Sequence, residues 1–218
     1  MEFDAVVVGS GIAGCVSAYY LAKDGFSVCI INNAVNPEDS NTYHAQGGIV
    51  FRGKNDSPDL LYEDIMSAGA GISNPDAARI VADESESAVE EVLINKFGVE
   101  FSKDGSGLFD LTEEAAHSSR RILHAFDSTG RSIEEKAVQA LENCENLTFL
   151  TDHTVIDIIT LDHHSSDKFR KYQPITSMGV YAADNKTGKV IKILSKIVVL
   201  ASGGLGQIYL HTTNPVEA

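Results

Sequence analysis

The sequence predicts an α/β fold with a parallel sheet and a small antiparallel meander. A short β-branched run at residues 3–8 ends at a glycine-rich turn, a helical pattern and a second apolar run follow it, and strand patterns crowd residues 179–201. Short apolar runs bounded by glycine are typical of strands buried on both faces of a sheet. Because a helix separates the first two runs, their strands should lie parallel, with a right-handed crossover.

The first element pair is the best defined part of the pattern. Residues 11–23 carry apolar side chains at helical spacing, and Asp24 and Gly25 supply a turn and helix-end signal. Residues 27–31 form the second buried run. Residues 3–31 are therefore predicted to form a βαβ unit.

The later elements follow from the same patterns. Asn74 and Pro75 suit a helix cap and first turn. The sequence predicts a long polar loop at 32–59, helices at about 59–68, 74–96 and 132–141, an irregular stretch at 98–130, apolar runs within 147–160, a solvated loop at 162–173, and strands at 179–183, 189–194 and 197–201.

Composition narrows the class of protein. The chain has 218 residues, 43% of them apolar and 22% charged, which is ordinary globular usage and long enough for a sizeable core. Its net charge of −14 has the wrong sign for binding nucleic acid or an anionic membrane surface. An anionic ligand would therefore be held by backbone N–H groups and helix dipoles.

Cysteine usage and the N-terminal sequence both indicate a cytoplasmic location. The three cysteines form no CxxC pair and no metal-ligand spacing, which fits a reducing compartment. The N-terminus lacks a basic leader, and no apolar run is long enough to span a membrane. We expect a soluble, cytoplasmic protein.

A glycine motif follows the first predicted strand and opens the first predicted helix. The motif runs Gly9-Ser10-Gly11-Ile12-Ala13-Gly14 and has the form GxGxxG. In this context the first glycine permits a tight turn, the second lets the backbone approach a pyrophosphate, and the third allows close helix packing. A dinucleotide site is predicted, and a chance glycine cluster is the alternative.

The end of the second strand departs from the usual dinucleotide pattern. Asn32 and Asn33 stand where an acidic residue would bind a ribose hydroxyl. An asparagine amide can still form a hydrogen bond with a hydroxyl, but as a neutral acceptor.

Two further glycine-rich segments suit the same kind of ligand. Ala45-Gln46-Gly47-Gly48 closes the long polar loop, and Ser202-Gly203 ends the last strand pattern. Glycines and small polar residues let a backbone follow the edge of a flat ring, and open α/β sheets bind ligands at the carboxyl ends of their strands. For the first segment, a disordered surface loop is the alternative.

The stretch from Glu113 to Gly130 is dense in ionisable residues, which indicates either a site or a solvated loop. His153 and the pair His163-His164 have no partner at metal-ligand spacing, so no metal site is predicted. Ser10 and Ser202 lack the GxSxG context of a serine hydrolase.

Taken in order, these motifs resemble the fumarate reductase and succinate dehydrogenase flavoproteins, and among them the L-aspartate oxidase family. The segments that carry the resemblance are VVGSGIAG at 7–14, AQGGI at 45–49, AGAGI at 68–72, HSxRRILHAxDxTG at 117–130, VVLAxGG at 198–204 and TTNP at 212–215. The resemblance spans nearly the whole chain.

The resemblance implies FAD as cofactor and a Rossmann-like FAD-binding domain. Asn41 occupies the position where respiratory relatives carry a histidine that attaches FAD covalently, so non-covalent FAD is expected. The residues expected to contact FAD are Gly9, Ser10, Gly11, Ile12, Ala13, Gly14, Asn33, Asn41, Thr42, Ala45, Gln46, Gly47, Gly48, Thr154, Val155, Ser202 and Gly203.

The resemblance also implies a substrate. Glu114 matches the family residue that orients the substrate amino group, although Ala115 and Ala116 replace two family glycines. A carboxylate facing an ammonium would distinguish L-aspartate from succinate. The implied reaction oxidises L-aspartate to iminosuccinate for quinolinate and NAD synthesis, with oxygen or fumarate as electron acceptor and quinolinate synthase as a pathway partner.

The family continues beyond TTNP into a capping domain, so residues 1–218 are expected to be the N-terminal part of the FAD-binding domain and inactive alone. The alternatives are a non-covalent fumarate reductase or succinate dehydrogenase-like flavoprotein and a non-catalytic FAD-binding remnant. A nicotinamide-dependent dehydrogenase is disfavoured because it would more often have a short connection in place of the Asn41–Gly48 loop.

Overall fold

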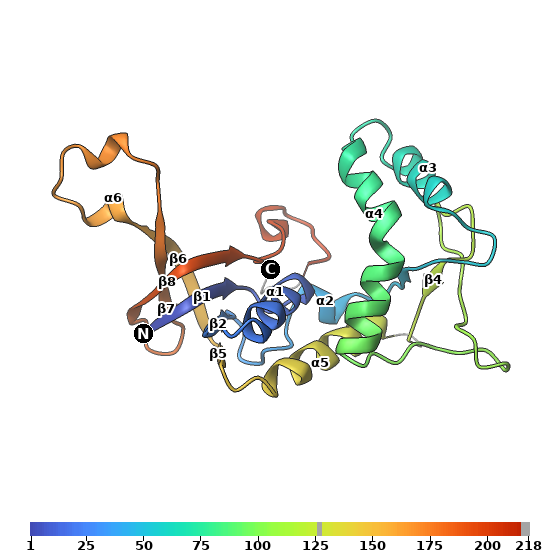
Figure 1. The fold of residues 1–218 in the computed structure, drawn as a ribbon, viewed down its shortest axis with the longest axis horizontal. Helices are drawn as coiled ribbons and strands as arrows, with labels where there is room; N and C mark the ends of the chain where they lie inside the picture. The colour runs from blue at the N-terminus through green and yellow to red at the C-terminus, as the bar shows by residue number, and fades with distance from the viewer. Residues whose placement is uncertain (126–127, 215–218) are drawn as a thin grey trace. The chain divides into compact units, whose positions relative to one another are not determined.

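A computed structural model describes residues 1–125 and 128–214 of the chain. They divide into two compact units, one formed by residues 1–44 with the chain from residue 137 onward and the other by residues 45–136. Helices and strands alternate along the first unit, so the predicted α/β class is confirmed (Figure 1).

The first unit is built on a six-stranded sheet with the strand order β5-β2-β1-β8-β7-β6. Its strands are β1 (Glu2–Val8), β2 (Val28–Ile31), β5 (Leu147–Leu150), β6 (His153–Thr160), β7 (Ser177–Asp184) and β8 (Val190–Leu200). β1 pairs in parallel with β2 and β8, and β2 with β5, whereas β7 is antiparallel to both of its neighbours. The predicted parallel sheet with an antiparallel meander is confirmed.

Helix α1 (Ile12–Lys23) completes the predicted βαβ unit and contacts β1 and β2. The residues that it buries are Gly14, Cys15, Ala18 and Ala22. Small side chains on this face let the helix lie close to the sheet. Gly25, at φ +88°, follows the helix and turns the chain toward β2.

One face of the sheet carries a buried apolar cluster. Val6 and Val8 of β1 and Cys29 and Ile31 of β2 belong to one buried cluster, together with residues of β7 and β8. Burial raises the pKa of the Cys29 thiol to about 12, so this cysteine stays a neutral apolar side chain.

The last part of the meander differs from the prediction. The separate strands expected at 189–194 and 197–201 form the single strand β8. Ser195 and Lys196 interrupt the apolar pattern but supply no turn residue. The pairing with β1 continues past them from Leu194 to Ile197, and Lys196 lies 3.5 Å from Asp4.

Short helical pieces lie within three regions that have little regular structure. The predicted long loop contains α2 (Asn41–His44), the predicted loop at 162–173 contains α6 (Leu161–His164) in part and η2 (Arg170–Tyr172), and η3 (Gly206–Ile208) follows β8. Phe169 and Tyr172 in the second region are mostly exposed.

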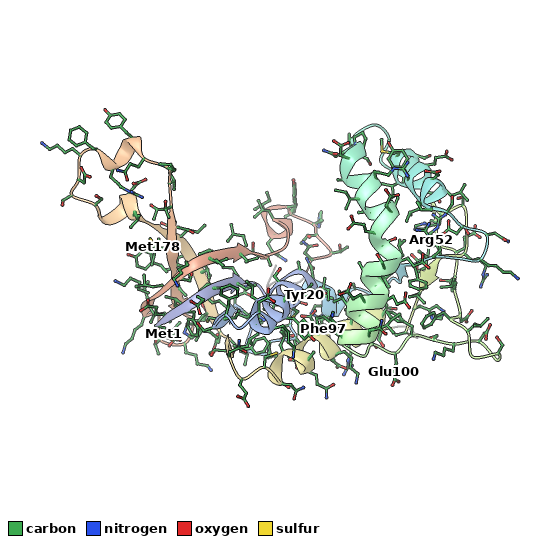
Figure 2. All side chains as sticks on the ribbon, in the orientation of Figure 1. Met1, Tyr20, Arg52, Phe97, Glu100 and Met178 are labelled. Atoms are coloured by element: carbon green, nitrogen blue, oxygen red, sulfur yellow. The ribbon has the colours of Figure 1, made fainter. Side chains whose placement is uncertain are left out.

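The second unit contains two helices that pack side by side and a small two-stranded sheet (Figure 1). The helices are α3 (Pro58–Ala68) and α4 (Pro75–Ala88), and the antiparallel strands are β3 (Ile49–Val50) and β4 (Ile122–Leu123). Arg52, labelled in Figure 2, donates to Ala82 O of α4 at 3.1 Å and pairs with Glu86 at 3.3 Å.

The predicted helices agree closely with the structure except at one point. Asn74 caps α4 by accepting a hydrogen bond from Ala77 N at 3.1 Å, and Pro75 occupies its first turn. The predicted 74–96 helix changes at Val89 into the π-helix η1 (Val89–Lys96), which Phe97 closes by donating to Val92 O. Helix α5 (Thr129–Glu142) extends the predicted 132–141 helix at both ends and joins the two units.

Among the described residues, none of the helices combines the length and the apolar character needed to cross a membrane.

Candidate functional site

A cleft of about 400 Å³ opens at the carboxyl ends of β1, β2 and β8 in the first unit. Its lining comes from the β1–α1 turn, the loop after β2, the start of β6 and the end of β8. The residues are Val8, Gly9, Ser10, Gly11, Ile12, Ala13, Ile31, Asn32, Asn33, Asp39, Ser40, Asn41, Thr42, His153, Thr154, Val155, Ala201, Ser202 and Gly203. This is the edge at which open α/β sheets bind ligands.

The three glycines of the motif have different geometric roles. Gly9 has φ +101°, and a side chain there would overlap the carbonyl oxygen of Ala201. A side chain at Gly14 would overlap the carbonyl oxygen of Gly9, so this glycine permits close packing of α1 and does not line the cleft. Gly11 borders the cleft, where a Cβ would lie 3.3 Å from Thr42 Oγ1.

The N-terminus of α1 faces this cleft. Ile12 N donates to Thr42 Oγ1 at 3.1 Å, which brings a residue of the loop after β2 to the first turn of the helix. Ser10 Oγ donates to Pro37 O at 2.5 Å and fixes the same loop from the other side. The positive end of a helix dipole and a nearby hydroxyl suit an anionic group such as a pyrophosphate.

The two asparagines after β2 have separate roles. Asn32 is buried, and its amide donates to Asn36 O at 3.2 Å while its oxygen accepts from Ala34 N at 3.2 Å. Its side chain therefore builds the turn. Asn33 is exposed and lines the cleft, at the place where the dinucleotide pattern puts a ribose-binding residue.

The rest of the cleft lining comes from strands that lie far from β1 and β2 in the sequence. Thr154 and Val155 of β6 line the cleft, as do Ser202 and Gly203 after β8. Gly203 has φ +75°, and a Cβ there would lie 4.0 Å from Asn41 Nδ2. The cleft thus brings together twelve of the residues predicted to contact the cofactor, all except Gly14 and the segment Ala45–Gly48.

Sequence reasoning missed several residues of the lining. Asp39 and Ser40 lie in the predicted long loop, and their nearness to Asn41 and Thr42 was the available signal. His153, to which the sequence analysis assigns no site, begins β6 and lines the cleft. No local pattern marks it, because the strand reaches the cleft only through the sheet order.

The residues present fit a dinucleotide. A volume of about 400 Å³ is within the ordinary range of small-molecule sites. The backbone at Gly11 can approach a ligand closely, α1 directs its N-terminus at the cleft, and Asn33 supplies polar groups at the far end of β2. Dinucleotide sites use features of this kind to hold a pyrophosphate and a ribose.

The second unit contains the other predicted site residues. Gly48 N donates to Glu114 Oε1 at 3.2 Å, which joins the glycine segment Ala45-Gln46-Gly47-Gly48 to the segment that carries the predicted substrate residue. Glu114 is exposed. Phe126 and Asp127, farther along the predicted 113–130 stretch, lie outside the described residues.

A buried ion-pair network anchors the Glu114 segment. Arg121 is fully buried, and its guanidinium bonds Asp56 at 2.7 and 2.9 Å and Asp64 at 2.5 Å. Burial alone would lower the pKa of Arg121, but the hydrogen bonds and charges of the two carboxylates outweigh it and raise that pKa above its ordinary value. A bridge between Thr112 and Ile122 closes the base of the same segment.

Among the described residues, no group of three or more histidine, cysteine or acidic side chains could hold a metal ion.

Comparison with known proteins identifies relatives over nearly the whole chain. L-aspartate oxidase, chloroplastic, from Oryza sativa is 38% identical over 217 residues, which cover 99% of this chain and 32% of the relative. L-aspartate oxidase from Halobacterium salinarum is 36% identical over 212 residues, covering 97% of this chain and 40% of the relative. The chain thus spans about a third to two fifths of the length of these relatives.

Solved structures share the fold. The Mycobacterium smegmatis Sdh1 complex in its apo form matches with a TM-score of 0.83 and 23% identity, covering 99% of this chain and 36% of that chain. A flavocytochrome c3 fumarate reductase in its open conformation matches with a TM-score of 0.76 and 23% identity, covering 94% and 34%. These likenesses confirm the predicted fold.

A family profile described as "FAD binding domain" matches residues 4–218. This match confirms the cofactor that the sequence resemblance predicts. The match spans both units of the structure, so the profile covers the residues of the cleft and also the segment around Glu114. The chain therefore belongs to the family of FAD-binding domains.

Proposed function

We propose that this chain holds FAD in the cleft of the first unit and is the FAD-binding part of an enzyme that oxidises L-aspartate to iminosuccinate. One observation carries the first half of the proposal. The N-terminus of α1, the open backbone at Gly11 and the polar residue Asn33 after β2 line one cleft, and a dinucleotide site uses these features for its pyrophosphate and its ribose.

FAD is held without a covalent bond in this proposal. Asn41 lines the cleft and offers an amide, which cannot form the histidyl linkage of the respiratory relatives. Gly9 to Ala13 supply backbone groups to the pyrophosphate, Asn33 binds the ribose, and Thr154 and Val155 contact the adenosine end. The segment Ala45–Gly48 and the residues Ser202 and Gly203 follow the flavin.

Glu114 is the residue proposed to select the substrate. An exposed carboxylate attracts the ammonium group of L-aspartate, which succinate lacks. Its hydrogen bond from Gly48 N, at 3.2 Å, fixes the carboxylate beside the glycine segment proposed to follow the flavin. FAD, when bound, supplies the chemistry by accepting the hydride that leaves the substrate Cα.

The rest of the catalytic machinery lies outside these residues in the proposal. The chain spans 32% and 40% of two L-aspartate oxidases that it resembles, so we expect it to bind FAD but not to turn over L-aspartate unaided. Oxygen or fumarate would reoxidise the flavin in the cytoplasm, and quinolinate synthase is the proposed consumer of iminosuccinate.

A titration with FAD tests the cofactor half of the proposal. The chain has no tryptophan, so flavin fluorescence can be followed without interference. We expect saturable quenching by FAD, no saturation by NADH, and release of all flavin into the supernatant on acid denaturation. Flavin that stays with the precipitated protein would contradict non-covalent binding, and NADH binding would indicate a nicotinamide enzyme.

Anaerobic flavin reduction tests the substrate half. The FAD-loaded chain, supplemented with a fragment that provides the remaining part of a relative, is mixed with L-aspartate or with succinate. Bleaching of the flavin band by L-aspartate alone is the expected result. Bleaching by succinate instead would indicate a dicarboxylate dehydrogenase, and binding of FAD without reduction by either substrate would indicate a non-catalytic module.

A further inference from the structure

Asn185, in the turn between β7 and β8, bonds to two residues that line the cleft but does not line it itself. Its Nδ2 donates to Asn33 O at 3.0 Å, and its Oδ1 accepts from Thr154 Oγ1 at 2.9 Å. Its backbone N–H donates to Asp152 O at 2.9 Å. One exposed side chain thus ties the loop after β2 to the first residues of β6.

The side chain of Asn185 is not needed to form its own turn. Asp184 Oδ1 accepts from Lys186 N at 2.8 Å and Thr187 N at 3.1 Å, and Gly188 N donates to Asp184 O at 2.8 Å. These bonds close the hairpin by themselves. The side-chain amide of Asn185 therefore bonds to other segments and does not stabilise its own turn.

The two segments that Asn185 joins both border the adenosine end of the cleft. Asn33 follows β2, where a dinucleotide site places the ribose, and Thr154 is the second residue of β6, whose start is bonded to the chain directly after β2. Backbone bonds hold the residues on either side of Asn33, since His153 N donates to Asn32 O at 3.1 Å and Asp152 N donates to Ala34 O at 2.7 Å. Asn185 adds the bond to the carbonyl of Asn33 itself. A chain segment loses conformational freedom when a ligand orders it. A residue that fixes Asn33 in advance removes part of that entropy loss from binding.

We propose that Asn185 is a positioning residue for FAD, which holds the adenosine end of the cleft in its binding geometry. This inference rests on the proposed function of the same cleft. The proposal means that a residue outside the cleft lining contributes to FAD affinity. The sequence around Asn185 indicates a hairpin turn and gives no sign of this role.

The test compares Asn185→Ala and Asn185→Asp with Lys186→Ala. The alanine variant removes both side-chain bonds, whereas the aspartate variant keeps the acceptor for Thr154 and turns a carboxylate oxygen toward Asn33 O. Lys186 lies in the same turn, and its exposed side chain pairs with Asp152 at 3.3 Å, so its alanine variant is the matched control. Circular dichroism melts of each variant without ligand show whether the fold is intact.

Three ligands separate a positioning role from a general structural one. FAD is titrated directly, and ADP and FMN are titrated as its competitors, because ADP carries the adenosine half and FMN lacks it. In both Asn185 variants we expect the dissociation constants of FAD and ADP to rise about tenfold, the change that one or two net hydrogen bonds produce. The constant for FMN and all constants of the Lys186 variant should stay within about twofold of the unaltered chain.

The results distinguish failure of the positioning role from failure of the proposed FAD-binding function. Equal weakening of FAD and FMN would mean that Asn185 supports the unit as a whole and would overturn the positioning role. Unchanged FAD affinity in both Asn185 variants would overturn it as well and leave the proposed function intact. Absence of FAD binding by the unaltered chain would overturn the proposed function itself, and this inference with it.

Discussion

Arg121 and Asp56 form a bidentate ion pair at 2.7 and 2.9 Å, and both side chains are fully buried. Planar two-point pairing of this kind fixes the direction of both groups as well as their distance. Because Arg121 ends the segment that carries Glu114, the pair sets where that segment leaves the core of the second unit.

Removal of one partner should destabilise this unit strongly. We expect Asp56→Asn to lower the free energy of unfolding by about 3 kcal/mol, because it replaces the bidentate carboxylate of the buried guanidinium by a neutral amide and leaves Asp64 as the remaining charged partner. Urea unfolding followed by circular dichroism measures the change. Arg79→Gln is the control, since Arg79 and its partner Asp59 are exposed and such pairs contribute less than about 1 kcal/mol.

Acid should weaken the same network through Asp64. Burial raises the pKa of this carboxyl, but hydrogen bonds from the Ser118 backbone, Arg121 and the Ser118 hydroxyl outweigh it and hold the pKa below the ordinary 3.8. The pKa of Asp64 is therefore lower in the folded chain than in the unfolded chain. Such a group stabilises the fold at any pH above its unfolded-state pKa, and this stabilisation is lost as the pH falls through its folded-state pKa. The contribution of Asp64 to the free energy of unfolding should therefore stay constant from pH 7 to about 4 and decline at lower pH.

The Asp64→Asn variant isolates this contribution. It should be less stable than the unaltered chain at pH 7 and should approach it as the pH falls below 4, since only the unaltered chain has the ionised group to lose. Urea midpoints measured between pH 7 and 3 provide the comparison. A constant difference between the two proteins over that range would contradict the assignment to Asp64.

The sequence predicts the local parts of the fold and site. Residues 3–31 form the expected βαβ unit because strand, glycine turn and helix signals are adjacent along the chain. The motif from Gly9 to Gly14 has the expected backbone geometry for the same reason, since all its constraints act within one turn. Asn74 caps α4 as its local pattern indicates.

Contacts between distant residues could not be predicted in this way. Asn185 and Asn33 are separated by 152 positions, and Arg121 and Asp56 by 65, so no periodicity or spacing joins them. The continuous strand β8 has a similar cause, because pairing with β1 carries it across Ser195 and Lys196, which the local pattern marks as a break. The change to a π-helix at Val89 has no signal in the periodicity either.

Ala116 adopts φ +66°, a left-handed conformation that a side chain disfavours. Ala116→Gly should therefore raise the free energy of unfolding by about 0.5 kcal/mol, since relief of about 1–2 kcal/mol of strain is partly offset by the greater freedom of glycine in the unfolded chain. Ala115→Gly is the neighbouring control, and it should lower the stability by about 0.4–1 kcal/mol. Equal destabilisation by the two substitutions in urea titrations would show that the conformation of Ala116 stores no strain.

The glycines of the motif should separate folding from cofactor binding. Gly14→Ala should lower the free energy of unfolding by about 3 kcal/mol or more, because its Cβ would overlap the carbonyl oxygen of Gly9 and force α1 away from β1. Gly105→Ala, with no atom within 4 Å of the added Cβ, should stay within about 0.5 kcal/mol.

Gly11→Ala should act on the ligand more than on the fold. Its Cβ would lie 3.3 Å from Thr42 Oγ1, a contact that a small shift relieves, so we expect a stability change of less than about 1 kcal/mol. The same methyl group projects where the pyrophosphate must approach the backbone, so FAD affinity should fall by about a hundredfold or more. Unfolding curves and FAD titrations on the same preparations distinguish the effects. Loss of stability without loss of affinity in Gly11→Ala would mean that the cleft binds its ligand elsewhere.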